Sequence, residues 1–196
     1  MSCISQIDFS AQCPRYGMGG VRAIWIGFKS AQTGVFYVDD GWCITNDTPV
    51  GFIRIPGSGS FQSVAQVDET TGLTYYRDEL SFTPAKGNPI NNTQQLAELQ
   101  AADPDDLLIL VETWTGYGSG DGYGDGNGYI MGKASNAPIF SDAANIMDVP
   151  VFFGGGQVVT GQARSDFNGQ QFTLTSVHPL PALGAYLGEL STPSTD

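Results

Sequence analysis

Charged residues are scarce in this sequence, and basic residues are the scarcest. Of 196 residues, 14% are charged, and eight Lys or Arg face twenty Asp or Glu, giving a formal net charge of −12. No two basic residues are adjacent: they are Arg15, Arg22, Lys29, Arg54, Arg77, Lys86, Lys133 and Arg164. Proteins that grip nucleic acid need clustered Lys and Arg to displace counterions from phosphates. The sequence therefore argues against tight nucleic-acid binding.

Cysteine and histidine are also rare. The cysteines, Cys3, Cys13 and Cys43, are odd in number and form no C-x-x-C pair, which argues against a disulfide framework or zinc site and favours a reducing place of synthesis. The single histidine, His178, precedes Pro179, and no G-x-S-x-G motif is present. Cys13 or Cys43 could pair with His178 as a nucleophile, but we expect His178 to be a surface residue and the protein not to be an enzyme.

Long hydrophobic runs are missing. The longest, Leu107 to Val111, is far too short to cross a bilayer. The first ten residues, MSCISQIDFS, have neither a basic start nor an apolar run, so we expect no signal peptide. No membrane insertion is predicted.

Carboxylates are adjacent in pairs such as Asp39-Asp40, Asp78-Glu79 and Asp105-Asp106. Neighbouring residues of a strand point to opposite faces of the sheet, so adjacency does not create an acid–base pair. We expect these side chains to be solvated at the surface.

Glycine, by contrast, is abundant, and seven glycines occupy every second position from Gly116 to Gly128. Their strict alternation excludes G-x-G-x-x-G, and Ala134 after Gly132-Lys133 excludes a phosphate loop. Asp121, Asp125 and Asn127 offer oxygen ligands for calcium, but Tyr123 interrupts the series and no acidic residue follows before Asp142. We expect no metal or cofactor, and interpret the stretch as the tip of a hairpin, where glycine supplies positive φ angles.

The remaining pattern is mainly that of strands. Val21–Phe28 is rich in β-branched and aromatic residues, and Val50–Ile55 ends at Pro56-Gly57-Ser58-Gly59, which predicts a break. Further strands are predicted at residues 35–38, 61–67, 73–83, 106–114, 128–133, 149–153, 157–163 and 170–177. A helix is predicted at about 92–103, with Asn92 as its cap and Pro104 ending it. These elements predict one all-β or β-rich domain over residues 1–196, a sandwich or barrel with one short flanking helix, with the terminal extensions on the surface.

Aromatic residues are numerous: eleven Phe, eight Tyr and three Trp. Trp25 and Tyr75 are expected to anchor the core or an interface. Many aromatics with few charges suit a chain that buries surface against its own copies. Stacking on sugars or single-stranded nucleic acid is the rival interpretation, which the missing basic residues weaken for nucleic acid.

The order of elements from Leu73 onward resembles that of phage tail tube proteins, the major tail proteins of long-tailed phages. The pieces that carry the resemblance are YYRDELSFTPAKG, NNTQQLAELQAA, DLLILVETW, GYIMGK and GQARSDFNGQQFTLT. They cover about the C-terminal two-thirds of the chain. The stretch from Trp114 to Tyr129 is longer than the tight hairpin expected, and residues 13–28 match no motif.

The resemblance implies a structural virion protein, made in the host cytoplasm, that forms hexameric rings stacking into a hollow tube. Other tail proteins would be partners, and DNA would pass through without specific binding. Tyr117, Tyr123 and Tyr129 would then pack on a neighbouring copy from the Gly116–Gly128 loop. The alternatives are another virion structural protein (a tail terminator, head–tail connector or decoration protein) and a carbohydrate-binding β-sandwich.

Overall fold

The computed structural model describes residues 20–33, 37–39, 43–46, 51–85, 93–113, 128–135, 146–159, 169–179 and 184–187. Within them lie twelve strands, one α-helix and one 3-10 turn. In chain order they are β1 (Val21–Phe28), η2 (Lys29–Ala31), β2 (Tyr37–Asp39), β3 (Cys43–Asn46), β4 (Ile53–Val67), β5 (Thr74–Pro84), α1 (Thr93–Ala101), β6 (Leu107–Thr113), β7 (Gly128–Met131), β8 (Lys133–Ser135), β9 (Ile146–Asp148), β10 (Val151–Val159), β11 (Gly169–His178) and β12 (Gly184–Leu187).

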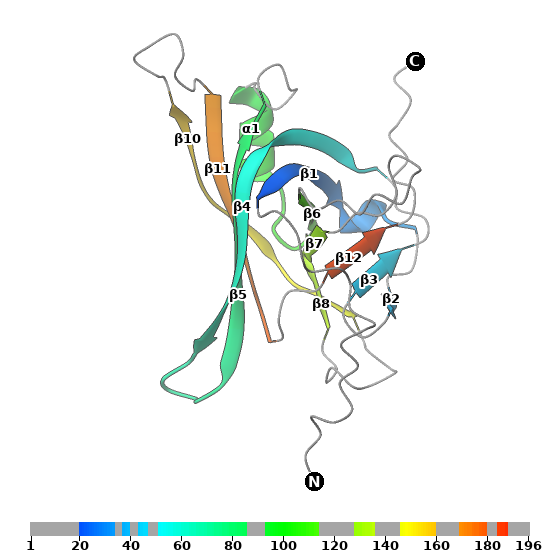
Figure 1. Cartoon of the computed structure of the whole chain (residues 1–196), viewed down its shortest axis with the longest axis vertical. Coiled ribbons are helices and arrows are strands. Elements are labelled where there is room, and N and C mark those ends of the chain that lie inside the picture. Colours follow the sequence, from blue (N-terminus) through cyan, green and yellow to red (C-terminus); the bar gives the residue numbers. More distant parts are fainter. Residues whose placement is uncertain are drawn as a thin grey trace.

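Ten of the strands form one sheet in the order β10-β11-β5-β4-β1-β6-β7-β12-β3-β2. Neighbouring strands are antiparallel except β12 and β3, which are parallel. β8 and β9 form a separate two-stranded sheet. The β-rich class and the single short helix are therefore confirmed, and the two layers expected of a sandwich are parts of one continuous sheet (Figure 1).

The long strand β4 joins two parts of this sheet. One part consists of β10, β11, β5 and β4, and the other contains β1, β6, β7, β12, β3 and β2. The first residues of β4 pair with β1 as far as Gly59, and Gly57 to Val67 pair with β5. One core lies between the parts, with side chains from both: Val21, Ile24, Ile26, Ile55, Leu80, Phe82, Leu99, Leu107, Ile109, Val111, Met131, Val151, Phe172 and Leu174. Leu99 places α1 against this core, which agrees with the short flanking helix expected from the sequence.

β6 is the most deeply buried strand. All five residues from Leu107 to Val111 are buried, because β1 and β7 flank it and both of its faces are covered. A continuous apolar run is typical of a strand buried on both faces. Its bounds agree with the prediction for 106–114 up to Thr113, the last described residue before the glycine-rich stretch.

The predicted break at Pro56–Gly59 is wrong, because β4 runs through it without interruption. The two glycines serve close packing. A Cβ on Gly57 would lie 2.3 Å from the Thr83 carbonyl oxygen, and one on Gly59 would lie 2.2 Å from that of Ser81. Glycine here lets the sheet bend sharply beneath Phe82, which a side chain would prevent.

Two further expectations change. The separately predicted strands at 149–153 and 157–163 form the single strand β10, whose register shifts between Phe153 and Gly155, where φ is +149°. The C-terminal tail, for which no strand was predicted, contributes β12, which pairs with both β7 and β3. A four-residue strand with one flanking glycine gives too little periodicity to be recognised in sequence.

Candidate assembly surfaces

The end of the β4–β5 hairpin projects beyond the body of the protein (Figure 1). β1 accompanies β4 only to Gly59, and β11 accompanies β5 only to Tyr76. Residues 62–76, called the arm here, extend about 20 Å at the usual rise per strand residue. Its apolar side chains are exposed, with Val64 45%, Val67 61% and Leu73 69% accessible. An extension that leaves large apolar side chains in water has the character of an interface element.

The arm ends in a well-defined turn. The Asp68 carboxylate accepts hydrogen bonds from the backbone N–H groups of Thr70, at 2.7 Å, and Thr71, at 3.2 Å. Gly72 closes the turn with φ +69° and donates its N–H to the Asp68 carbonyl at 2.7 Å. Residues 68–72, which lie between the strands predicted at 61–67 and 73–83, therefore form a tight turn. The hydrogen bonds from Thr70 and Thr71 lower the pKa of Asp68, so the tip keeps its negative charge.

Two strand edges, one on β4 and one on β10, have no partner among the described residues. β4 from Ser60 to Val67 pairs only with β5, and β10 pairs only with β11. Val151 donates its N–H to the Pro104 carbonyl at 2.9 Å, so the open edge of β10 begins at Phe152. Neither segment, SFQSVAQV nor FFGGGQVV, contains a charged residue or proline. Native proteins usually protect open edges with such residues, and an unprotected edge is a template for pairing with another chain.

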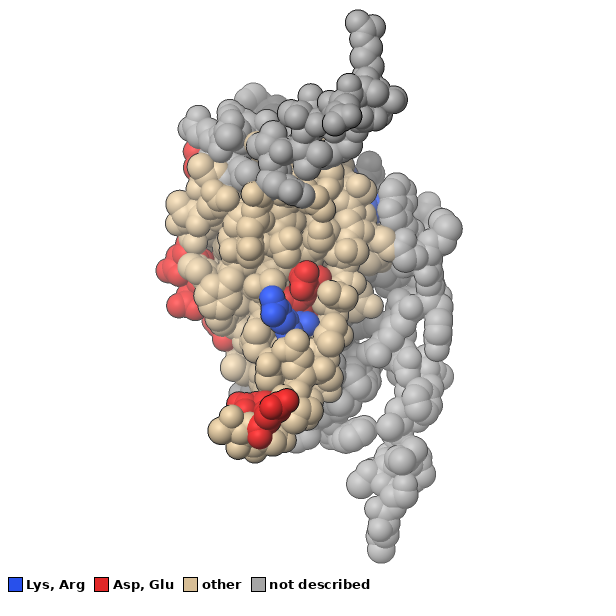
Figure 2. Space-filling model, turned by 90° about the vertical axis from the view of Figure 1, so that its left-hand side faces the viewer, with Lys and Arg blue, Asp and Glu red and all other residues tan. Residues whose placement is uncertain are grey.

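The four strands β10, β11, β5 and β4 have one face that the described core does not cover. The alternating burial of β5 places Asp78, Leu80 and Phe82 inward and Arg77, Glu79 and Ser81 outward. The register brings mainly hydroxyl and amide side chains to this outer face: Ser58, Ser60, Gln62, Ser81, Thr83, Gln171, Thr173 and Thr175. Figure 2 shows that uncharged residues make up most of this side.

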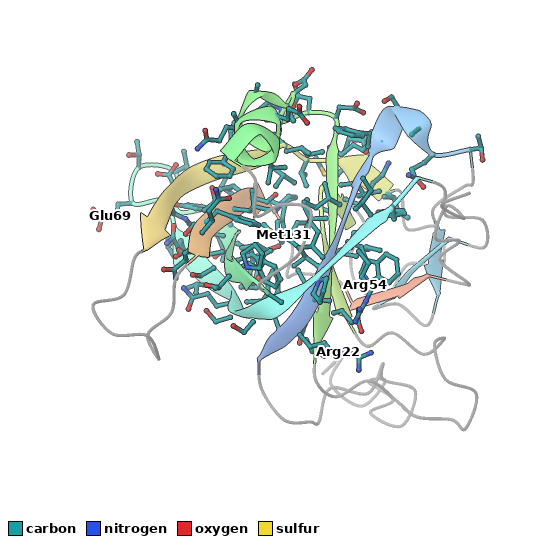
Figure 3. The ribbon with its side chains drawn as sticks, turned by 90° about the horizontal axis from the view of Figure 1, so that it is seen from above. Arg22, Arg54, Glu69 and Met131 are labelled. Atoms are coloured by element: carbon teal, nitrogen blue, oxygen red, sulfur yellow. The ribbon has the colours of Figure 1, made fainter. Side chains whose placement is uncertain are left out.

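A polar cluster lies where β1, β4 and β6 meet. The register of β1 and β6 shifts between Val21 and Ala23, the residues on either side of Arg22. The resulting bulge turns Arg22 toward Glu112. Arg22 forms an ion pair with Glu112 Oε1. Arg54 reaches the same carboxylate through Nε, 3.0 Å from Oε2, and Nη2, 3.2 Å from Oε1. Both arginines extend from neighbouring strands toward one side of the sheet (Figure 3).

Trp25 completes the cluster. Its Nε1–H donates to Glu112 Oε2 at 3.0 Å, and the Arg54 guanidinium lies 5.8 Å from the centre of its ring. Trp25 was expected to anchor the core or an interface; it is half-buried and lies in this polar cluster, outside the hydrophobic core. Burial alone would raise the pKa of Glu112, but the hydrogen bonds and charges of Arg54, Trp25 and Arg22 outweigh it, and the pKa is lowered. Glu112 is therefore ionised, and the cluster of two arginines and one carboxylate carries one excess positive charge.

His178 is buried, which corrects the expectation of a surface residue. Only 3% of its side chain is accessible, and Nε2 lies 2.7 Å from Oδ2 of Asp78, whose side chain is 1% accessible. Asp78 was expected at the surface with Glu79, but strand alternation sends one of two neighbours to the core face, and here it is Asp78. Asp78 Oδ1 is buried without a hydrogen-bond partner among the described residues. The pair stands at the root of the arm, where β11 ends, and Tyr76 stacks on the imidazole with ring centres 6.4 Å apart.

The other residues singled out in the sequence are placed as follows. Cys43 lies in β3, where it pairs with Gly184, while Cys13 lies outside the described residues. So do Asp121, Asp125 and Asn127, and the Gly116–Gly128 loop apart from Gly128. Tyr129 stacks on Phe61 of the same chain with ring centres 4.7 Å apart. Tyr117 and Tyr123 lie outside the described residues, and Tyr75 is half-buried on the outer face.

Within the described part of the chain, no group of three or more His, Cys, Asp or Glu residues is arranged to hold a metal ion. The one described α-helix, nine residues long, is no candidate for a membrane span. Comparison of the chain with models of protein families, with curated proteins and with solved structures finds no match.

Proposed function

We propose that the protein is a structural subunit that assembles with its own copies into rings, and that the rings stack into the hollow tail tube of a phage. The observation that carries the proposal is the pair of uncharged open edges on β4 and β10, at opposite ends of the four-strand part of the sheet. The resemblance of the C-terminal two-thirds of the sequence to tail tube proteins supports the same function.

The two edges favour a head-to-tail contact. If the open edge of β4 in one copy pairs with the open edge of β10 in the next, the four-strand part continues from copy to copy. Such a contact uses different surfaces on the two partners. It closes into a ring when the rotation angle between neighbouring copies is a whole fraction of a full turn. Six copies per ring is the number that the resemblance implies.

The outer face then becomes the wall of the channel, because the core, α1 and the rest of the sheet lie on the opposite side of the four strands. Among the described residues, Arg77 and Glu79 are the only charged side chains that the register of β5 brings to this face. A wall of hydroxyl and amide groups with balanced charge lacks the clustered cations that hold phosphates. DNA would slide past such a wall without being bound, which agrees with a conduit.

Assembly tests the proposal directly. Purified protein is imaged by negative-stain electron microscopy at high concentration, beside the variant Ala65→Lys. Ala65 is exposed on the open edge of β4, and a lysine on an edge strand prevents pairing with another chain. We expect rings or tubes from the wild-type protein and none from the variant.

Thr175→Lys is the matched control, since it adds the same charge on the interior strand β11. We expect it to assemble. Rings from Ala65→Lys as abundant as those of the wild type would contradict pairing through the β4 edge. Monomers alone from the wild-type protein, at every concentration and in the presence of other tail components, would contradict the proposed function and leave the decoration and sugar-binding alternatives to be tested with ligands.

A further inference from the structure

The polar cluster of Arg22, Arg54, Glu112 and Trp25 has a binding capacity that its own contacts do not use. Glu112 takes Nε and Nη2 of each arginine. A guanidinium has five N–H donors, so the Nη1 groups of both arginines are left over from the contacts with Glu112. The two side chains are 40% and 33% accessible, so each arginine is partly exposed to solvent.

The arginines are also held in place. Each is fixed by two bonds to a carboxylate that is itself only 11% accessible, and Arg54 additionally lies against the Trp25 ring. A fixed guanidinium loses little rotamer entropy when it binds a second oxyanion, and arginine suits planar, two-point recognition of carboxylates. With two cations and one anion, the cluster reaches charge balance when one further carboxylate binds.

The arm carries a carboxylate that matches this site. Of its two tip acids, Asp68 is engaged by its own turn, whereas Glu69 is exposed on the turn beside it. Val67 and Leu73 flank the turn and are among the most exposed large apolar side chains of the described residues. They would pack beside the site and help to exclude water from the ion pair, which strengthens it.

Glu69 cannot reach the site of its own chain. Figure 3 shows Glu69 at one edge of the molecule and Arg22 and Arg54 together on a different side. A contact between them must therefore join two copies, and it uses different surfaces on each, which is the same head-to-tail relation as edge pairing.

We propose that the arm tip of one copy docks on the polar cluster of another copy, with the Glu69 carboxylate bound between Arg22 and Arg54. The proposal rests on the proposed assembly and names a second contact within it. The chain carries −12, so its copies repel each other over most of their surfaces. A fixed patch with excess positive charge gives the acidic arm one favourable place to dock, which makes the contact specific as well as attractive.

Charge reversal tests this contact by sedimentation of the full-length chain over a range of protein concentrations. Glu69→Lys places a cation against two arginines, and we expect it to weaken self-association about tenfold. Arg22→Glu is expected to weaken it similarly, and the double variant Glu69→Lys with Arg22→Glu to restore much of the loss. Glu98→Lys makes the same change on the exposed surface of α1 and is expected to associate as the wild type does.

The outcomes separate this contact from the proposed function. If the double variant recovers self-association but no protein forms tubes in electron micrographs, the docking contact is supported and the tail-tube function is overturned. Wild-type tubes with an unchanged association constant for Glu69→Lys would overturn the docking contact alone. A double variant that associates no better than the two single variants would also overturn it, and so would a wild-type chain that stays monomeric throughout. Near-native circular dichroism of each variant establishes that the monomer is folded.

Discussion

Glu112 and Asp78 are both shielded carboxylates, but the protein surrounds them differently. Glu112, in the middle of the sheet, receives bonds from two arginines and the Trp25 indole, so both of its oxygens are paired. Asp78, at the root of the arm, has His178 on one oxygen and no partner for the other among the described residues. The first region has more donors than its carboxylate requires, whereas the second has too few. The sheet centre is therefore equipped for a further ligand, whereas at the arm root His178 is the one partner that the described residues give the Asp78 carboxylate.

The largest effect is expected from breaking the contact between His178 and Asp78. His178→Ala leaves Asp78 buried without a partner, and breaking a buried pair from one side costs about 3–5 kcal/mol. Urea unfolding of the variant measures the change in free energy of unfolding. Replacing both residues by leucine removes the unpaired polar group, and we expect the double variant to recover most of the loss. A cost below about 1 kcal/mol for His178→Ala would show that Asp78 finds another partner.

Neither the pair nor its importance could be predicted from sequence. The two residues are 100 positions apart and meet only because β11 pairs with β5 in one register. The neighbouring Pro179 suggested a surface loop, but β11 continues to His178 itself. Strand alternation indicated that Asp78 and Glu79 face opposite ways, and it could not indicate that one of those faces is the core.

Local patterns were more informative. Val21–Phe28 forms β1 with the predicted bounds, because its β-branched and aromatic residues fit a central strand. The Asp68–Gly72 turn was also predictable, since a polar stretch ending in glycine is typical of a tight turn. The predicted strand break at Pro56 to Gly59 was wrong. Proline and glycine usually end a strand, whereas here the glycines permit the bend that joins the two regions. The polar cluster was missed because its members come from three strands.

The two regions meet at Gly59, where a side chain would collide with both the backbone and Phe82. A Cβ there would lie 2.2 Å from the Ser81 carbonyl oxygen and 3.1 Å from the Phe82 ring. Gly59→Ala is therefore expected to destabilise the fold by about 1–3 kcal/mol, as overpacking does. Gly154→Ala on β10 is the matched control, because its Cβ would make only ordinary contacts, the closest at 3.4 Å. Equal unfolding midpoints for the two variants would contradict the steric role of Gly59.

A smaller effect is expected at the sheet centre. Glu112→Gln keeps an acceptor but removes the charge between two arginines that are partly exposed, so we expect a loss of about 1 kcal/mol at neutral pH. The pKa of Glu112 is lowered in the folded protein. Its contribution is thus fully present above the ordinary carboxyl pKa of 4.5 and is lost as the pH falls through the lower folded value.

The difference in unfolding free energy between wild type and Glu112→Gln should therefore shrink on acidification below about pH 4.5. Unfolding curves at several pH values measure it. A difference that stays constant down to the lowest pH at which both proteins fold would show that Glu112 does not act through its charge.

The smallest effect is expected at the arm tip, where the charge lies in water and acts only on its own turn. Asp68→Ala removes the acceptor for the Thr70 and Thr71 amides, so their hydrogen exchange should accelerate while that of Leu80 and Leu174 in the core stays unchanged. In the wild type the amide shifts of both threonines should titrate with a midpoint below 3.8, because their hydrogen bonds lower the pKa of Asp68. If Asp68→Ala also accelerated exchange at the root of the arm, the tip and the Asp78–His178 pair would belong to one cooperative unit, and the arm could not be treated as an independent docking element.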